Sequence, residues 1–132
     1  MKVIEMELVE TLIIQLTARK SVIHLRPEDL RYLQKEEDIR LMEYISSERS
    51  GKNRMDDVIS QFLEDPEVDT KDYTSCICII ETSEKGALMM SEMEAFQKLP
   101  YSFKAEVKLQ WAYNINPGIA DNKCKLIIII SR

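Results

Sequence analysis

The sequence predicts an α/β domain of two layers, in which helices pack on a mixed sheet of four strands. Helical and strand-like segments alternate along the chain, and this order is typical of a sheet covered by helices. The apolar residues of one segment recur at the spacing of a single helix face: Met55, Val58, Ile59, Phe62 and Leu63. That face must lie on a sheet.

The composition is that of one compact domain. The chain has 132 residues, of which 45% are hydrophobic, and only three are glycine. A chain of this length buries one core but not two. We therefore expect a single domain over 1–132, with a helical segment over 1–20, a loop and short helix over 21–35, and an α/β sandwich over 36–132.

The net charge of -5 argues against broad contact with nucleic acid or anionic lipid. Glu5 and Glu7 lie where a signal peptide would have an uninterrupted apolar run. The longest such run, Leu126 to Ile130, is too short to span a bilayer. We expect a cytoplasmic protein with no nucleic-acid partner and no direct membrane insertion.

The first predicted element is a helix over 3–19, which ends near Arg19 and Lys20 because cations suit the negative end of a helix dipole. Its apolar residues form one stripe: Met6, Val9, Ile13 and Leu16. The helix leads into a junction, residues 21–33, around which the rest of the chain is organised.

A short helix begins inside the junction at Pro27 and ends near Lys35. Glu28 and Asp29 suit the positive end of its dipole. Arg26 occupies the capping position, although its side chain has no acceptor for the free N–H groups. A local flaw of this kind marks a place where function or tertiary structure overrides propensity.

The middle of the chain predicts two strands around the amphipathic helix. A strand is expected over 39–47, followed by a turn over 50–53 that caps the helix, which Pro66 ends. Residues 74–80 are almost entirely apolar and rich in β-branched side chains. They predict a central strand that is covered on at least one face.

A fourth helix is expected to run to about Lys98, with Ser91 and Glu94 as a capping box and Pro100 closing it. Three methionines lie near it, and we expect them to be adaptable core filler rather than a binding surface: Met89, Met90 and Met93.

Two strands remain, over 107–113 and 125–130. The turn signal Asn116-Pro117-Gly118 lies between them and predicts that they pair as an antiparallel hairpin. Trp111 alternates with Leu109 and Tyr113, which indicates a sheet face under a helix.

The residue types alone indicate no active site, metal site or cofactor site. No glycine-rich phosphate loop is present, and His24 is the only histidine, whereas a catalytic base needs partners. Cys76 and Cys78 share one face of a strand, so a metal site is conceivable. With no second pair and no clustered histidines, they and Cys124 are expected to be reduced core residues.

The order of elements resembles the C-terminal domain of FtsZ, the bacterial tubulin homologue, over nearly the whole chain. Several short segments carry this resemblance in the family's order and spacing: Ser21 to Leu30, Ser50 to Arg54, Leu63 to Pro66, Ile79 to Thr82, Ser91 to Met93, and Trp111 to Asp121. The resemblance implies the α/β domain with a four-stranded mixed sheet that FtsZ shares with chorismate-mutase-like proteins, preceded by part of a long central helix.

In that family, the first of these segments enters the nucleotide site of the next subunit in a filament, where two acidic residues orient the water that attacks GTP. The family's asparagine falls on His24, its first aspartate on Arg26 and its second on Asp29. The resemblance thus implies a subunit-contact loop of His24, Arg26, Glu28 and Asp29, with Asp29 as the retained catalytic candidate. Arginine cannot polarise water as a base, so we expect weak or absent stimulation of GTP hydrolysis.

The family's GTP-binding half, with its glycine-rich loop, is not in this sequence. GTP is therefore expected only with an N-terminal nucleotide-binding domain. The implied partner is the GTP-binding domain of the same or a related FtsZ-like protein, with homo-oligomers as a further possibility.

Two other functions stay open at this point. A small enzyme of the chorismate-mutase-like fold, acting as an oligomer, would need basic residues around a dianionic substrate, and the candidates are scattered: Arg31, Arg40 and Arg49. A ligand-sensing or adaptor domain would keep the fold without polymer contacts.

Overall fold

The computed structural model describes residues 1–18, 21–47, 53–103 and 106–132. In these ranges, six strands form one mixed sheet in the order β1-β3-β6-β4-β5-β2. The strands are β1 (Lys2–Val3), β2 (Ser21–Ile23), β3 (Ile39–Ile45), β4 (Ser75–Thr82), β5 (Lys108–Ile115) and β6 (Lys125–Ser131). Strands β4 and β5 are parallel, and the other neighbours are antiparallel.

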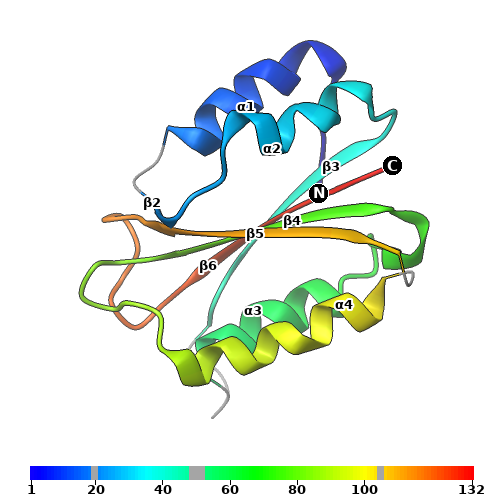
Figure 1. Ribbon diagram of the computed structural model, residues 1–132. Helices are drawn as coiled ribbons and strands as arrows, with labels where there is room; N and C mark the ends of the chain where they lie inside the picture. The colour runs from blue at the N-terminus through cyan, green and yellow to red at the C-terminus, as the bar shows by residue number, and fades with distance from the viewer. Residues whose placement is uncertain (19–20, 48–52, 104–105) are drawn as a thin grey trace.

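Helices cover both faces of the sheet (Figure 1). On one face lie α1 (Val9–Thr17), which follows the 3₁₀ turn η1 (Met6–Leu8), and α2 (Pro27–Leu30), which continues as η2 (Arg31–Lys35). On the other face lie α3 (Arg54–Leu63) and the 3₁₀ helix η4 (Met90–Lys98), which continues as α4 (Leu99–Ser102). The short turn η3 (Thr70–Asp72) precedes β4.

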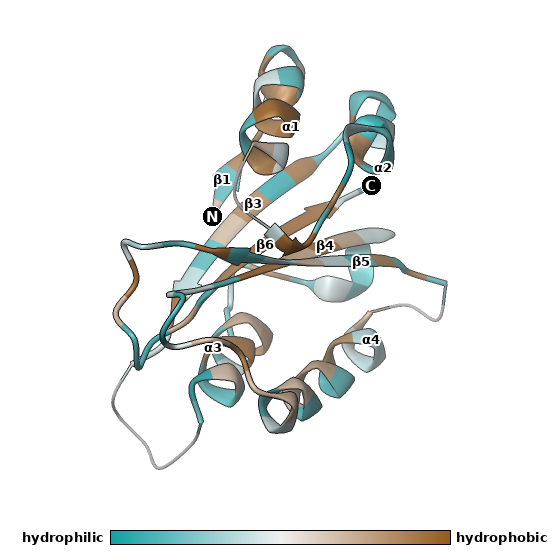
Figure 2. Ribbon diagram, turned by 60° about the vertical axis from the view of Figure 1, so that its left-hand side comes forward, coloured by the Kyte–Doolittle hydropathy of each residue, from teal (hydrophilic) through white to brown (hydrophobic). Residues whose placement is uncertain are grey.

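The sheet separates two apolar cores, whereas the length of the chain predicted only one. One contains residues from α1 and alternate residues of the central strands: Val9, Leu12, Ile13, Leu16, Ile77, Ile79, Ile127 and Ile129. The other contains the apolar face of α3 and the intervening strand residues: Met55, Val58, Ile59, Phe62, Cys76, Cys78, Ile80, Leu126, Ile128 and Ile130. Figure 2 shows hydrophobic residues in α1 and in the middle of the sheet, between the helical layers.

These cores confirm the mixed α/β class and the central position of β4. Every residue of β4 is buried, because both faces of the strand are covered and successive side chains point to opposite faces. The four predicted strands form the middle of the sheet as β3, β6, β4 and β5, and the short strands β1 and β2 extend it at the edges. The N-terminal helices add a third layer to the two that the sequence predicted.

The predicted hairpin between the last two strands is wrong. Strand β4 lies between β5 and β6, so that Cys78 faces Trp111 on one side and Ile128 on the other. Parallel pairing of β4 with β5 needs a crossover, which η4 and α4 supply. The long connection after β5 then carries the chain past β4 to its other side.

The N-terminal helix begins later than predicted. Lys2 and Val3 pair with β3 instead, and regular α-helix begins at Val9. Met6 is 55% exposed, and Leu12 takes its place in the buried stripe. Arg19 and Lys20, which were expected at the helix end, lie outside the described residues. Within the described ranges, no helix has the length and apolar character needed to cross a bilayer.

The caps of the later helices differ in part from the prediction. Asn53 caps α3 by accepting a hydrogen bond from the Asp56 N–H at 2.8 Å, whereas residues 50–52 of the predicted turn lie outside the described residues. Glu92, not Glu94, closes the start of η4, since it accepts from the Met89 N–H at 3.0 Å.

Pro100 does not end the fourth predicted helix either. It lies in the first turn of α4, where its missing N–H costs nothing, so the chain continues as helix to Ser102.

Candidate functional site

The predicted contact loop, residues 24–29, follows β2 and includes the first turn of α2. Leu25 and Leu30 are buried on either side of its polar tip, at 8% and 0% exposure. The side chains of the predicted site differ in exposure: His24, Arg26 and Glu28 are exposed, and Asp29 is half-buried. The loop therefore presents mainly polar side chains while its apolar residues hold it to the domain.

Asp29 caps the helix that Arg26 cannot cap. Its Oδ2 accepts a hydrogen bond from the Arg26 N–H at 3.0 Å, and its own N–H donates to the Arg26 carbonyl at 3.0 Å. This reciprocal arrangement repairs the local flaw at the start of α2. Within the described ranges, no acidic side chain forms an ion pair with the Arg26 guanidinium. Arg26 thus presents a guanidinium without an acidic partner at the tip of the loop, beside the exposed carboxylate of Glu28.

The base of the loop is anchored to the sheet by buried polar groups. The Ser21 hydroxyl donates to Asn114 Oδ1 at 2.8 Å, and these two residues also pair in the β2–β5 ladder. Glu81, which is fully buried at the end of β4, accepts from the side-chain amides of Asn114 and Asn116 at 3.5 and 3.1 Å. This network was missed from the sequence, although an acidic residue ending an apolar strand was a signal for it.

Arg54 joins three segments through one guanidinium group. Its Nε donates to Glu92 Oε2 at 2.7 Å, and Nη2 donates to the Gly86 carbonyl at 2.7 Å. Nη1 donates to the carbonyl of Lys123 at 3.1 Å. The Arg54 side chain is only 13% exposed, so it binds protein groups and is not positioned to bind a substrate.

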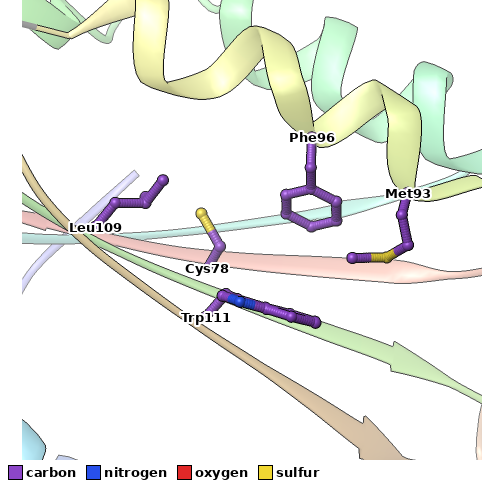
Figure 3. A pocket seen from close by; sticks show the side chains of 5 residues that line it. All are labelled: Cys78, Met93, Phe96, Leu109 and Trp111. Atoms are coloured by element: carbon purple, nitrogen blue, oxygen red, sulfur yellow. The ribbon is translucent and has the colours of Figure 1, made fainter.

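An apolar cavity of about 240 Å³ lies between η4 and the sheet (Figure 3). Its lining comes from β4, β5 and η4: Cys78, Leu109, Trp111, Met93 and Phe96. The rings of Phe96 and Trp111 lie 6.2 Å apart between centroids at an interplanar angle of 41°. Leu109, Trp111 and Tyr113 therefore form a sheet face under a helix, as predicted.

A second cavity, of about 460 Å³, adjoins the first and shares Met93 and Trp111 with it. Met89 and Met90, which also line it, are 65% and 87% exposed. The expectation that these two methionines fill the core is wrong. They lie at the very start of η4, before its buried residues begin, so they are left at the surface beside β2.

The basic residues considered for an enzymatic pocket do not converge. The Arg31 guanidinium lies 3.7 Å from Glu10, and Arg40 lies 2.6 Å from Asp38, so each is paired with an acid. Arg49 lies outside the described residues. In the part of the chain that the structure describes, no group of three or more His, Cys, Asp or Glu side chains could hold a metal ion.

The cysteines Cys76, Cys78 and Cys124 are all free and buried, as predicted. Cys76 and Cys78 Sγ lie 3.6 Å apart on one face of β4. The hydrogen bond between these thiols and their burial hold the pKa of Cys76 well above its usual value.

No protein-family model matches the sequence. No curated protein matches it either.

Solved structures do match the fold. FtsZ from M. jannaschii, in a structure described as an empty dimer, matches with a TM-score of 0.73 at 14% identity, over 95% of this chain and 36% of that chain. A point mutant of the same FtsZ matches with a TM-score of 0.70 at 16% identity, over 93% of this chain and 38% of that chain. TubZ of Bacillus thuringiensis serovar israelensis, in its GDP-form protofilaments, matches with a TM-score of 0.60 at 11% identity, over 86% of this chain and 31% of that chain.

These likenesses confirm the predicted resemblance at the level of the fold. The chain has an FtsZ-like and tubulin-like fold, and it spans little more than a third of the length of the FtsZ chains that it matches.

Proposed function

We propose that this chain is the C-terminal, polymer-contact part of an FtsZ-like cytoskeletal GTPase. In this proposal, the loop over 24–29 docks on the nucleotide-bearing face of a neighbouring subunit. The observation that supports it is the exposed polar loop that follows β2, with Arg26 unpaired by any acid in the described ranges. The partner is the GTP-binding domain of the same or a related FtsZ-like protein.

The matched structures support assembly as part of this function. The FtsZ structure is described as a dimer and the TubZ structure as protofilaments. By analogy, GTP would be bound by an N-terminal nucleotide-binding domain and contacted by this loop from the next subunit. This chain would then complete a nucleotide site and would not be catalytic alone.

The chemistry of the loop favours binding over hydrolysis. A carboxylate in such a loop assists hydrolysis only when assembly brings it within reach of a water at the γ-phosphate. Arg26 is a phosphate-binding side chain rather than a base. Asp29, the other candidate, uses one carboxylate oxygen to cap α2. We infer that the loop attracts the nucleotide's phosphates and stimulates GTP hydrolysis weakly or not at all.

The first test is to titrate this protein into a polymerising FtsZ-type GTPase from the same organism. Filament mass would be followed by sedimentation, and phosphate release would be followed in the same samples. Inhibition at substoichiometric ratios is expected, because the protein would occupy filament ends. No effect at a several-fold excess would contradict the proposal.

Charge reversal at the loop tip provides the matched comparison. Arg26→Glu should weaken the inhibition, because a carboxylate repels phosphate where the guanidinium attracts it. Lys85→Glu is the control, since Lys85 is an exposed cation on a different loop and its reversal should leave the inhibition unchanged. Equal effects of the two substitutions would indicate a response to net charge and not to the loop.

The same assay tests the inference about hydrolysis. Arg26→Asp should raise phosphate release per filament mass above that with the unsubstituted protein, because it restores a carboxylate at the position of the family's first aspartate. Robust stimulation of hydrolysis by the unsubstituted protein would rule out this part of the proposal.

A further inference from the structure

Most of one edge of β5 has no neighbouring strand. On the side away from β4, β2 pairs with β5 only at Tyr113 and Asn114, and within the described ranges no other strand borders β5 there. In Figure 1, β2 meets one end of β5, and the rest of β5 runs along the border of the sheet. We call this side of residues 108–112 the free edge.

The free edge presents backbone groups that can pair with another strand. The Lys108 N–H donates to the Thr74 carbonyl at 2.9 Å, so the even-numbered residues of β5 face β4. The N–H and C=O groups of Leu109 and Trp111 therefore point to the free edge. Edge strands are usually protected by charged side chains, proline or a bulge, whereas residues 109–112 contain neither charge nor proline and pair regularly with β4.

The two apolar cavities described above lie along this edge, on the side of η4. Trp111, which is 39% exposed, lines both of them, and Leu109 lines the smaller one. Figure 3 shows Phe96 and Met93 pointing from η4 toward the sheet. The larger cavity continues past the exposed Met89 to β2. An open backbone edge thus runs beside two adjoining apolar cavities.

We propose that the free edge binds an extended peptide of a partner protein as an added antiparallel strand, with two apolar side chains inserted into the two cavities. These side chains belong to peptide residues two apart, because such residues point to the same face of a strand. Opposite Leu109 and Trp111, they would lie on the η4 side, as the side chains of those two residues do. The one beside Trp111 would enter the larger cavity.

The surface selects a peptide rather than a small apolar molecule. Its outward N–H and C=O groups need partners at the spacing of a backbone, while the cavities supply apolar contacts and specificity. The direction follows β2, which is antiparallel to β5 and which the peptide would continue in line. The free edge spans residues 108–112, or about 17 Å, before β2 closes it, and this length suits a short segment. No residue of the contact loop takes part, so the inference does not rest on the docking function proposed above.

The test uses fluorescein-labelled peptides of the form Lys-Thr-X-Thr-X-Thr-Lys, in which both X residues are Val, Leu or Phe. Fluorescence anisotropy measures their binding, and saturable binding of one peptide per chain is expected. Unlabelled peptide should shift the Trp111 emission to shorter wavelength, because the ring loses contact with water, and Trp111 is the only tryptophan in the chain. Hydrogen exchange of the Leu109 and Trp111 amides should slow in the complex.

Methylation of the peptide backbone separates strand addition from apolar contact alone. In an antiparallel pair, the X residues opposite Leu109 and Trp111 would exchange both hydrogen bonds with them. Methyl groups on the nitrogens of both X residues should therefore weaken binding by more than about tenfold. The threonine that follows each X residue directs its N–H away from β5, so methyl groups on those two nitrogens should be tolerated.

A charge at the larger cavity provides the test on the protein side. Met89→Glu should weaken binding by more than about tenfold, because the peptide would bury the new carboxylate among apolar side chains. Ile14→Glu is the matched control, since Ile14 is 60% exposed against 65% for Met89 but lies on α1, across the sheet. Far-ultraviolet circular dichroism would establish that both variants keep the fold.

Several results would each overturn the proposal. One is the absence of binding by all three peptides up to about 1 mM. Equal binding of the two methylated peptides would mean that the cavities bind apolar groups without an added strand. Equal weakening by Ile14→Glu would indicate a response to net charge. A dimer of the protein that sedimentation shows to dissociate in Met89→Glu would assign the free edge to a second copy of this chain.

Discussion

At the scale of single residues, the pair of Arg54 and Glu92 differs from the other ion pairs in its burial. Their side chains are 13% and 12% exposed, whereas Arg31 and Glu10 are 54% and 51% exposed. Exposed pairs contribute little to stability, because water and salt screen them. A buried pair is costly to break, because the remaining partner is left as an uncompensated charge. We therefore expect Glu92 to matter for stability far more than Glu10.

The first prediction concerns acid denaturation. Burial by itself raises the pKa of Glu92, but hydrogen bonds from Arg54 and from the Met89 N–H outweigh it and hold the pKa below the usual value of a glutamate. A carboxyl group with a depressed pKa stabilises the fold fully above its unfolded-state pKa and loses that contribution as the pH falls through the folded-state pKa. The free energy of unfolding should therefore fall as the pH drops below about 4.5. Urea denaturation at a series of pH values between 7 and 3 measures this change in the free energy of unfolding.

Glu92→Gln should lower the stability at pH 7 by about 1–3 kcal/mol and should make the remaining pH dependence shallower. Glu10→Gln is the control, and it should keep the stability and the slope of the unsubstituted protein. Some acid sensitivity should persist in both variants, because the hydrogen bond from Arg40 also lowers the pKa of Asp38. If the free energy of unfolding of Glu92→Gln depended on pH as steeply as that of the unsubstituted protein, Glu92 would not be the source of the acid sensitivity.

At the scale of elements, two loops meet at Gly86 without room for a side chain. A Cβ at Gly86 would lie 2.0 Å from the Asp121 carbonyl oxygen and 2.7 Å from its carbonyl carbon. The Ser83 hydroxyl joins the same loops by donating to Asp121 Oδ1 at 2.7 Å and accepting from the Gly86 N–H at 2.9 Å. The backbone contact explains why a single glycine is needed between β4 and η4.

The second prediction is that Gly86→Ala destabilises the protein by at least about 1–3 kcal/mol, measured by urea denaturation. The obstructing atoms belong to backbone, so the two loops would have to separate, and the Arg54 contact with the Gly86 carbonyl would be strained.

Gly118→Ala provides the comparison. Its Cβ would meet only the side-chain oxygen of Asn116, at 3.2 Å, and a side chain can adjust. This variant should be nearly neutral, because alanine also restricts the unfolded chain. If both substitutions had equal effects, the close approach of the loops at Gly86 would not be the cause.

At the scale of the whole molecule, one sheet serves as the wall of two cores. Alternate residues of β4 face opposite layers, so Ile77 and Ile79 pack with α1 while Cys76 and Cys78 pack with α3 and η4. Neither helical layer can separate without exposing this central strand. We expect the three layers to unfold as one cooperative unit.

The third prediction tests this coupling across the sheet. Ile13 is 1% exposed on the α1 face, whereas Trp111 lies on the opposite face beside η4. Ile13→Ala should lower the stability by about 2–5 kcal/mol, the usual cost of a buried isoleucine. The urea midpoint of the Trp111 fluorescence should shift together with the midpoint of the far-ultraviolet circular dichroism.

The neighbouring residue Ile14 supplies the control, because it lies on the same helix and is 60% exposed. Ile14→Ala should change the stability by no more than about 0.5 kcal/mol. A Trp111 midpoint that did not move in Ile13→Ala would mean that the layers unfold separately.

The sequence predicted those parts of the candidate site that consist of consecutive residues. It did not predict the parts that join distant segments. The loop over 24–29 was found because its residues are consecutive and resemble one family segment. The capping of α2 by Asp29 was not predicted. The sequence did mark the position, because Arg26 has no side-chain acceptor to cap the helix. The link from Ser21 through Asn114 to Glu81 joins three strands and has no common spacing in the sequence.

The sequence by itself determined the α/β class, the positions of the four central strands and the buried face of α3, apart from Leu63, which is 36% exposed at the end of that helix. Periodicity within a segment records which side meets the core. Only the tertiary structure decided that β4 separates β5 from β6, that β1 and β2 extend the edges, and that Met89 and Met90 are exposed. Strand neighbours and surface exposure depend on segments that are distant in the chain. Local propensity does not encode those contacts. They are determined by the requirement that both faces of the sheet be buried at once.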